Sequence, residues 1–498
     1  MGTHRDASIV IIGTGFSGLG MAIQLKQAGM HDFVILEKAQ DVGGTWRDNT
    51  YPGCACDIQS HLYSFSYEQN PDWSRLWAPQ QEIWDYLRRC TDKHGIRRHI
   101  QFGAKVSGAS FDDDTKQWTV RTESGDTYTA RAVVAGVGAL HIPSIPQLRG
   151  IEKFKGTTFH SAEWNHDYDL TGKRVAVIGT GASAIQFVPE IAKKVGHLTL
   201  FQRTPAWVRP KPDRAVSSWE RRLLKLLPGA LKTRRTALFW QLDARAIAFS
   251  MNPKLLKLAS RSVVRHIAKQ VPDPELRAKL TPDYTMGCKR VLISNDYYPT
   301  FSRPNVDLVT EGISEVREHS VVTADGVEHE VDAIIYGTGF HVTDAFDYLD
   351  IKGRDGVDLN SQWAEKGLET YLGITVSGFP NLFFLLGPNT GLGHNSVVLM
   401  IEAQTKYVLQ CLKLLDKHDV DAMDVRPAAQ DRFNRDIQAK LRKGVWSVGG
   451  CKSWYLDSAG VNRTVWPGFV WQYVLRTNRV ELADYELLAA TRPKVLSR

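Results

Sequence analysis

Two glycine-rich turns hold the residues of this 498-residue sequence that are best suited to binding phosphate groups. At the first turn, the strand-like run "SIVII" leads into Gly13, Gly15 and Gly18 and then into helix-forming residues. In this G-x-G-x-x-G order, the first glycine permits a tight turn, the second lets a pyrophosphate approach the backbone, and the third lets the helix pack on the strand. The free N–H groups at the start of the helix then face the phosphates.

Glu37 supports a dinucleotide at this first turn. It ends a second strand-like run, "DFVILE", 19 residues after Gly18, where a carboxylate can accept hydrogen bonds from ribose hydroxyls. A solvated charge at the end of a strand is the alternative role. The full order of strand, glycines, helix, strand and acid favours ligand binding, so we predict that an adenine dinucleotide, FAD or NAD, binds here.

A second turn of the same kind lies in "KRVAVIGTGASAIQ", with Gly179, Gly181 and Ala184 at the three positions. Alanine is tolerated at the third position, where the helix packs on the strand. The strand-like run that follows ends in Gln202 and Arg203 instead of an acid. An arginine can form a bidentate, charge-assisted contact with a 2′-phosphate, which an acid would repel. This site therefore favours NADPH, with a solvated Arg203 as the alternative.

Two dinucleotide sites in one chain indicate an electron relay, in which NADPH reduces a flavin and the flavin does the oxidative chemistry. We therefore assign FAD to the first site and NADPH to the second. A further strand-like run, "EVDAIIYGTGF" (residues 330–340), ends in two glycines. It is predicted to return the chain from the NADPH-binding part to the FAD-binding part.

The stretch "FKGTTFHSAEWN" between the two turns has the form F-x-G-x-x-x-H-x-x-x-W, with Phe154, Gly156, His160 and Trp164, followed by Asn165. It resembles the fingerprint of the type I Baeyer–Villiger monooxygenases, a flavoprotein family related to the flavin-containing monooxygenases. The family has Pro or Asp where this sequence has Asn165. The resemblance implies an interdomain linker in which His160 couples cofactor binding to domain movement and is not a general base.

A second signature of the same family supports the resemblance. "GGTWRDNTYPGCACD" matches the form G-G-x-W, then an aromatic residue, Pro, Gly and an Asp four residues later. The matching residues are Gly43, Gly44, Trp46, Tyr51, Pro52, Gly53 and Asp57. Together with the paired glycine turns, the two signatures cover nearly the whole chain.

The resemblance assigns the catalytic role to Arg290, in the stretch "GCKRVLISNDYY". In the family, a C4a-peroxyflavin attacks a ketone, and a fixed guanidinium stabilises the peroxide and the adduct because an arginine stays charged. Asp57 is implied to pair with Arg290 and to position it. Lys289 is implied to reach the 2′-phosphate of NADP together with Arg203. Arg303, in the same segment, is the rival arginine, and its place before a proline favours a structural role.

The implied fold is an α/β fold with two Rossmann-like dinucleotide-binding domains and a helical insertion in the NADPH domain. Residues 1–145 and 340–498 are expected to form the two parts of the FAD-binding domain. Residues 146–212 are expected to form the linker and first part of the NADPH-binding domain, and residues 286–339 its second part. The helical insertion is expected at residues 213–285.

The two cofactors are expected to contact the glycine turns, their flanking residues and parts of both signatures. These residues are Gly13, Gly15, Phe16, Ser17, Gly18, Glu37, Lys38, Gly44, Thr45, Trp46, Asp57, Tyr63, Val106, Gly179, Thr180, Gly181, Ala182, Ser183, Ala184, Arg203, Thr204, Lys289 and Trp454. For Trp454, a contact with the nicotinamide or substrate and a place in the core are both open. No metal site is expected.

The insertion has apolar residues at helical spacing and many basic residues. A lid over the substrate pocket and an interfacial helix that touches lipid are two interpretations. We favour an amphipathic helical insertion with a solvated basic face that helps to shape the pocket.

Composition excludes several other classes of protein. The net charge of +8 comes without a dense basic run with interleaved aromatics, which argues against nucleic-acid binding. No signal peptide or membrane span is expected, the six cysteines are expected to be reduced thiols, and a cytoplasmic location follows.

The sequence thus predicts an FAD- and NADPH-dependent monooxygenase that converts a small ketone and O2 into an ester or lactone. One alternative is a flavin-containing monooxygenase that oxygenates sulfur or nitrogen. A second is a pyridine-nucleotide flavin reductase, but its C-x-x-C or C-x4-C pair is replaced here by Cys54-x-Cys56. Linear, cyclic, aromatic and steroid ketones all remain open as substrates.

Overall fold

The N-terminal part of the chain builds a five-stranded parallel sheet around the first glycine turn. The computed structural model describes residues 2–342, 344 and 347–490. The strand order is β20-β8-β2-β3-β4, and every neighbouring pair is parallel. The strands are β2 (Ile9–Ile12), β3 (Phe33–Glu37), β4 (Ile100–Phe102), β8 (Ala132–Ala135) and β20 (Leu382–Phe384). We call this the N-terminal sheet; its last strand comes from far along the chain.

The apolar strands of the N-terminal sheet are covered on both faces, as parallel strands require. Helices α1 (Phe16–Gln27) and α11 (Val397–Lys417) pack together in the core on one face. On the other face, a second five-stranded sheet of order β1-β7-β6-β5-β19 shares a core cluster with the N-terminal sheet. Its strands are β1 (His4–Asp6), β5 (Val106–Asp112), β6 (Gln117–Thr122), β7 (Thr127–Ala130) and β19 (Asp350–Lys352).

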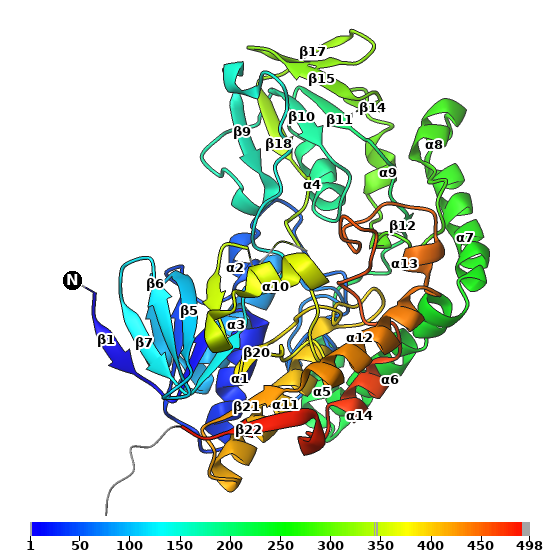
Figure 1. The fold of residues 1–498 in the computed structure, drawn as a ribbon. Coiled ribbons are helices and arrows are strands. Elements are labelled where there is room, and N and C mark those ends of the chain that lie inside the picture. The colour runs from blue at the N-terminus through cyan, green and yellow to red at the C-terminus, as the bar shows by residue number, and fades with distance from the viewer. Residues whose placement is uncertain (1, 343, 345–346, 491–498) are drawn as a thin grey trace, which may run out of the picture.

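The middle of the chain builds a separate five-stranded parallel sheet around the second glycine turn, which we call the central sheet (Figure 1). Its order is β14-β11-β10-β18-β9, with β9 (Thr157–His160), β10 (Arg174–Ile178), β11 (His197–Phe201), β14 (Val306–Val309) and β18 (Ala333–Tyr336). A small antiparallel sheet of β15 (Ile313–Val316), β16 (Ser320–Thr323) and β17 (Glu328–Glu330) extends it. The predicted α/β class is confirmed by these parallel sheets.

Two chain segments that connect the N-terminal and central sheets lie side by side. Pro143 and Phe340 form an antiparallel bridge, and Ser144 N–H donates to Gly339 O at 2.9 Å. His341 N–H donates to Ile142 O at 3.0 Å. The two segments that connect the N-terminal sheet to the central sheet are therefore hydrogen-bonded to each other.

The segment expected to be a helical insertion is helical. It holds α5 (Ser218–Leu226), α6 (Ala230–Asp243), the π-turn η4 (Ile247–Met251), α7 (Lys254–Gln270) and α8 (Pro274–Leu280), all on the right-hand side of Figure 1. Strands β12 (Val208–Arg209) and β13 (Leu292–Ile293) pair in parallel and join both ends of the segment. No helix in the described ranges has both the length and the hydrophobicity that crossing a bilayer requires.

The remaining helices and strands cover the sheets or carry loops. They are α2 (Thr45–Asp48), α3 (Gln80–Lys93), α4 (Ala184–Ile191), α9 (Tyr297–Thr300), α10 (Leu359–Lys366), α12 (Pro427–Leu441), α13 (Val445–Val448), α14 (Val470–Arg476), β21 (Ala422–Val425) and β22 (Tyr485–Leu488). Short turns of 3-10 helix lie at Arg97–His99, Ile151–Lys153, Ser161–Glu163, Arg354–Gly356 and Leu482–Asp484.

The fingerprint stretch folds as part of the central sheet. Strand β9 is its edge strand and pairs with β18, with His160 opposite Tyr336. The His160 ring lies 5.7 Å from the ring of Phe340 on one of the two connecting segments. The stretch expected to be a linker is thus a strand, and its last residue, His160, packs on one of the two connecting segments.

Expecting all six cysteines to be reduced is wrong for two of them. Cys288 and Cys451 form a disulfide across a sequence separation of 163 residues, with Cα atoms 6.1 Å apart. Folding brings these two side chains together, and a sequence separation of that size conceals the pairing. Cys54, Cys56, Cys90 and Cys411 are free and buried.

Gly156 of the fingerprint has no room for a side chain. A Cβ atom there would lie 2.4 Å from Asp332 O and 2.5 Å from the Phe154 ring. We expect Gly156→Ala to cost about 1–3 kcal/mol because the neighbouring backbone must move. Gly312 has nothing within 4 Å of the same position, so Gly312→Ala is the matched control. Thermal unfolding should show a lower midpoint for Gly156→Ala alone; equal midpoints would contradict the packing described here.

Candidate active site

The first glycine turn lines a cavity of about 460 Å³ at the carboxyl ends of β2 and β3. Gly13 has a φ of +94°, which favours glycine. A Cβ on Gly18 would lie 1.9 Å from Gly13 O, and one on Gly13 would lie 2.9 Å from Gly136 O. Three backbone segments therefore touch where a side chain would separate them, and the space beside them stays open for a ligand.

Most of the residues predicted to bind the first cofactor line this cavity. They are Gly13, Gly15, Phe16, Ser17, Glu37, Lys38, Gly44, Thr45, Trp46, Tyr63 and Val106. Gly18 and Asp57 do not line it. Further lining residues that sequence reasoning missed include Thr14, Arg47, Gly136, Gly138, His141, Tyr348, Leu386, Val397 and Ile401. The run "AVVAGVG", a strand that ends in two glycines, is the signal that points to Gly136 and Gly138.

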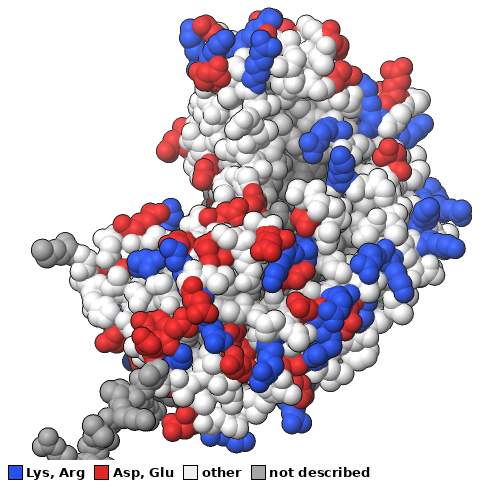
Figure 2. Space-filling view, in the orientation of Figure 1, with Lys and Arg blue, Asp and Glu red and all other residues white. Residues whose placement is uncertain are grey.

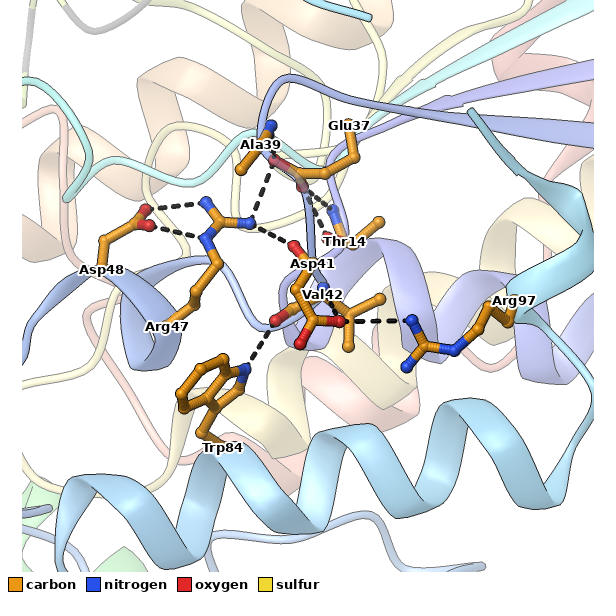
Figure 3. Close-up of polar contacts among 9 residues, drawn as sticks. All are labelled: Thr14, Glu37, Ala39, Asp41, Val42, Arg47, Asp48, Trp84 and Arg97. Carbon is orange, nitrogen blue, oxygen red and sulfur yellow. Dashed lines mark hydrogen bonds and ion pairs between the residues drawn. The ribbon is translucent and has the colours of Figure 1, made fainter. Parts of the chain in front are cut away.

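Glu37 is held at the cavity by backbone and side-chain donors (Figure 3). Its Oε2 accepts from the N–H and hydroxyl of Thr14 at 3.0 and 2.5 Å, and its Oε1 accepts from Ala39 N–H at 2.9 Å. Arg47 Nη1 lies 3.1 Å from Oε1, and the same guanidinium forms two hydrogen bonds with Asp48. The buried carboxylate is thus fixed as an acceptor at the strand end, where ribose hydroxyls would bind.

The neighbouring loop is fixed in the same way. Arg47 Nη1 also donates to Asp41 O at 2.6 Å, and Trp84 Nε1 donates to Val42 O at 2.8 Å (Figure 3). Arg97 Nη1 donates to the Asp41 carboxylate at 3.3 Å. This set of contacts holds the loop between β3 and α2, which carries the G-G-x-W signature, against helix α3.

The second glycine turn is open to solvent. Gly179 has a φ of +106°, and a Cβ there would lie 2.5 Å from Gly337 O. Thr180 Oγ1 donates to Thr204 O at 3.1 Å, which joins the turn to the end of β11. Gly181 and Ala182 are exposed, and a Cβ on Gly181 would have only Gly337 O near it, at 3.6 Å. The turn therefore presents free backbone, followed by Ser183 and by Ala184 at the start of α4.

Two cations, Lys289 and Arg203, interact electrostatically near the end of β11, and the charge of Asp283 also acts on Lys289. Burial and the nearby charge of Arg203 both lower the pKa of Lys289. The Lys289 ammonium lies 5.2 Å from the centre of the Tyr284 ring. In the described part of the chain, neither Lys289 nor Arg203 forms an ion pair. An anion such as a phosphate would reduce the electrostatic repulsion between Lys289 and Arg203.

Arg290 and Asp57 are 233 residues apart in sequence and in contact in the structure. Arg290 Nε donates to Asp57 Oδ2 at 2.9 Å, and Arg290 Nη2 donates to the same oxygen. The Asp57 charge raises the pKa of Arg290 further above its ordinary value. The guanidinium is therefore charged at every physiological pH and is fixed in direction by the carboxylate.

Asp57 is placed by contacts between its own segment and α4. Tyr51 Oη donates to Gln186 Oε1 at 3.0 Å, and the Gln186 side chain exchanges hydrogen bonds with the Ala55 backbone. A Cβ on Gly53 would lie 2.8 Å from Gln186 O. The second signature therefore fits closely against the helix that follows the second glycine turn.

Tyr455 is a site residue that the sequence reasoning missed. It is buried with its phenol beside the Arg290 guanidinium, and burial raises its pKa. The neighbouring Trp454 is largely exposed, with its ring 4.2 Å from the Tyr455 ring. Trp454 is therefore not a core residue. The disulfide lies two residues before Arg290 and four before Tyr455, so it ties the two segments together.

His160 does not have the properties of an acid or base in this structure. Its Nδ1 accepts from Ala162 N–H at 3.1 Å, and burial lowers its pKa to about 4. The rival arginine, Arg303, is exposed just after α9. Cys54 and Cys56 are buried, and burial raises the pKa of Cys54 to about 12, so this pair is poorly suited to the thiolate chemistry of a disulfide reductase.

Known proteins were compared with this chain by family, by sequence and by structure. Residues 10–238 match the family described as pyridine nucleotide-disulphide oxidoreductase. The chain is 52% identical to a Baeyer–Villiger monooxygenase of Pseudomonas aeruginosa over 484 residues, which cover 97% of this chain and 92% of the relative.

Two solved structures are similar along nearly the whole chain. The closed crystal structure of cyclohexanone monooxygenase is similar with a TM-score of 0.87 and 29% sequence identity. The match covers 98% of this chain and 100% of the chain in that structure. A structure of OTEMO in complex with FAD and NADP has the same TM-score and identity, with coverages of 97% and 99%. The predicted fold of two Rossmann-like domains is thereby confirmed.

The Cys288–Cys451 disulfide closes a long loop in the unfolded chain, so its loss should cost stability. We expect Cys288→Ser together with Cys451→Ser to lower the free energy of unfolding by about 2–4 kcal/mol. Differential scanning calorimetry should show a lower unfolding midpoint for this double variant. The matched control is Cys411→Ser, which removes a buried free thiol. Two results together would contradict the disulfide. A reducing agent would leave the unfolding midpoint of the unaltered protein unchanged, and both Cys288 and Cys451 would react with a thiol reagent after that protein is unfolded without reductant.

Proposed function

Because the chain belongs to the Baeyer–Villiger monooxygenase family, we propose that its Arg290–Asp57 pair carries the family's reaction in this protein. The protein is an FAD- and NADPH-dependent enzyme that inserts one oxygen atom of O2 beside a ketone carbonyl and releases an ester or lactone. The observation that supports the role of the pair is a permanently charged guanidinium, oriented by a carboxylate, between the two nucleotide turns.

The residues present fit both cofactors. At the first turn, the open glycine backbone and the fixed acceptor Glu37 suit the pyrophosphate and ribose of FAD. At the second, the exposed turn at Gly181 suits a pyrophosphate, and the unpaired cations Arg203 and Lys289 suit the 2′-phosphate of NADPH. We propose these residues as the cofactor contacts.

When bound, the reduced flavin supplies activated oxygen from O2 as a nucleophile toward the ketone. Arg290 provides positive charge where negative charge develops on the attacked carbonyl oxygen. Asp57 holds the guanidinium at one edge, which leaves its other edge to face the reacting groups. Arginine suits this role because it keeps its proton in a dry site, where a lysine can lose it.

His160 and Tyr455 have supporting roles in this proposal. Burial lowers the pKa of His160 to about 4, so the ring is neutral at neutral pH. At the end of β9 it packs on Phe340 of a connecting segment, and we propose a structural role for it. The buried Tyr455 phenol lies beside Arg290, where we propose that it helps to position the guanidinium. Trp454 is exposed on the same loop, where we propose that it contacts the nicotinamide or the substrate.

We also propose the division of the chain that the sequence suggested. Residues 1–145 and 340–498 form the FAD-binding domain, residues 146–212 and 286–339 the NADPH-binding domain, and residues 213–285 its insertion. The two tied connecting segments near Pro143 and Phe340 support this division. We place the enzyme in the cytoplasm, where NADPH is available, with a small ketone and O2 as its partners.

Arg290→Ala tests the catalytic assignment. One preorganised electrostatic donor is worth about a hundred- to a thousandfold in rate, so ester formation should fall by that factor or more. FAD binding and flavin reduction by NADPH should persist, because neither cofactor turn is altered. The matched control is Arg303→Ala, which removes an exposed arginine from the same segment. Normal ester yield from Arg290→Ala would show that the assignment is wrong.

Arg203→Gln and Lys289→Gln test the assignment of the 2′-phosphate site. Each removes a charge-assisted contact worth about 1.5–3 kcal/mol, so the KM for NADPH should rise roughly tenfold to a hundredfold. The KM for NADH, which lacks the phosphate, should change little. Stopped-flow reduction of the flavin measures both, with the exposed Lys194→Gln as control. An equal effect on NADPH and NADH would contradict a phosphate contact.

A further inference from the structure

The positive charge of the protein is concentrated in its helical insertion. Between positions 221 and 269 the sequence has twelve Lys and Arg residues and one acid, Asp243. The whole chain has 62 Lys and Arg against 54 Asp and Glu, so the other residues hold 50 against 53. The rest of the chain is therefore nearly neutral, and one strongly basic segment runs from α5 to α7.

The same segment exposes a row of large apolar side chains. Trp240 lies on α6, Ile247 and Met251 on the π-turn η4, and Leu255 and Leu258 on α7; we call these five residues the apolar row. Their side chains are between 43% and 68% exposed. Ile247 and Met251 are four residues apart on η4, and Leu255 and Leu258 are three apart on α7, which places each pair on one side of its own helix. Asn252, with φ −139° and ψ 80°, separates the two helices. Large exposed apolar patches on a soluble protein commonly mark an interaction site.

The residues of the apolar row are not needed for the protein core, because other apolar residues of each helix are already buried in it. Leu238 and Leu242 of α6, Phe249 of η4 and Leu256 of α7 are all buried. These residues join the helices to the rest of the protein. The apolar row is thus a second apolar side, left over after the core has been formed.

Cations border the apolar row. Lys254 and Lys257 alternate with Leu255 and Leu258, and the outward side of α7 continues into Arg261 and Arg265. In the described part of the chain none of these four cations forms an ion pair. Figure 2 shows blue side chains over α7 at the right-hand edge of the molecule, with little red beside them.

The neighbouring helix α14 adds to the exposed apolar surface. Asp243, at the end of α6, accepts a hydrogen bond from Val470 N–H at 2.8 Å, so α14 begins beside the end of α6. Trp471, Val474 and Leu475 of α14 are exposed. Exposed apolar side chains therefore occur on α14 as well as on the segment that carries the apolar row.

We propose that the apolar row and its bordering cations dock the enzyme on an anionic lipid bilayer. Lys and Arg side chains would lie among the anionic headgroups, while Trp, Leu, Ile and Met side chains enter the boundary of the acyl chains. A second copy of this chain fits less well, because two strongly basic segments would face each other and repel. A nucleic acid also fits less well, because four of the five residues of the row are not aromatic and offer its bases neither stacking nor hydrogen bonds.

The helices that carry the docking surface pack on the chain segment just before Arg290, the proposed catalytic arginine. A Cβ on Gly287 would lie 3.0 Å from the Phe249 ring and 3.1 Å from Leu256, so the inner side of this segment packs on the chain just before Arg290. Resting on the proposed function, this proximity implies that apolar ketones dissolved in the membrane are the substrates that docking favours.

Vesicle flotation of the full-length, FAD-loaded protein tests the proposal. The probes are vesicles of phosphatidylcholine and phosphatidylglycerol in equal parts, and vesicles of phosphatidylcholine alone. We expect binding to the anionic vesicles only, and weaker binding as salt is added. Absence of binding to the anionic vesicles at low salt, or binding that is equal for both kinds, would overturn the proposal.

Charge and apolar variants locate the contact. The triple variant Lys254→Glu, Lys257→Glu and Arg261→Glu should bind the anionic vesicles roughly a hundredfold more weakly. Replacing Met251 and Leu258 by Ser should also weaken binding, without any change of charge. Unchanged binding of either variant would mean that another surface is used or that the apolar row does not insert.

The matched control for the charge variant carries the same charge change elsewhere. Lys153→Glu, Lys173→Glu and Lys194→Glu alter three exposed lysines in the central part of the chain, and vesicle binding should persist. If both triple variants lose binding alike, net charge alone governs it and the proposed surface is wrong. A dimer in sedimentation that the Met251 and Leu258 variant abolishes would instead assign the row to a second copy.

The binding measurement requires no turnover, so it stands even if the enzyme converts no ketone. A second measurement compares turnover of a long-chain ketone carried in anionic vesicles with that of a short, water-soluble ketone. The Lys254, Lys257 and Arg261 variant should lose activity on the first and keep it on the second. Equal activity on both would show that docking does not deliver substrate.

Discussion

The contact between Arg290 and Asp57 is the interaction on which the arrangement of this enzyme depends. In the catalytic role that we propose, the Arg290 guanidinium must keep one direction, which a flexible side chain alone does not ensure. The carboxylate of Asp57 fixes its direction and secures its charge. Because Asp57 belongs to the N-terminal part of the chain and Arg290 to the central part, this contact forms only when the two halves are correctly placed.

Several features of the fold serve that placement. The segment from Tyr51 to Asp57 is joined to α4 through Gln186, so the segment that carries Asp57 contacts the helix that follows the second glycine turn. The two connecting segments are hydrogen-bonded to each other, and His160 packs on them. On the other side, the Cys288–Cys451 disulfide ties the Arg290 segment to the loop of Tyr455.

Local patterns in the sequence were sufficient to predict much of this structure. The glycine turns at Gly13 and Gly179, Glu37 at the end of β3 and the helices of the insertion all follow from residues close together in sequence. Pairing Arg290 with Asp57 required the family resemblance, since no local pattern relates residues 233 positions apart. The disulfide and the contact of Tyr455 with Arg290 were missed for the same reason. The exposure of the apolar row was also hidden, because helical spacing alone does not tell which of two apolar sides is buried.

The most direct measurement is product analysis of the FAD-loaded enzyme with NADPH, O2 and a mixed panel of ketones and thioethers. Mass spectrometry would detect esters, lactones and sulfoxides, with hydrogen peroxide assayed in parallel. Esters or lactones are the predicted products, because we propose that Arg290 stabilises nucleophilic attack on a carbonyl. Sulfoxides without any ester or lactone would contradict this account and would assign the enzyme an electrophilic oxygen transfer that has no need of the Arg290–Asp57 pair.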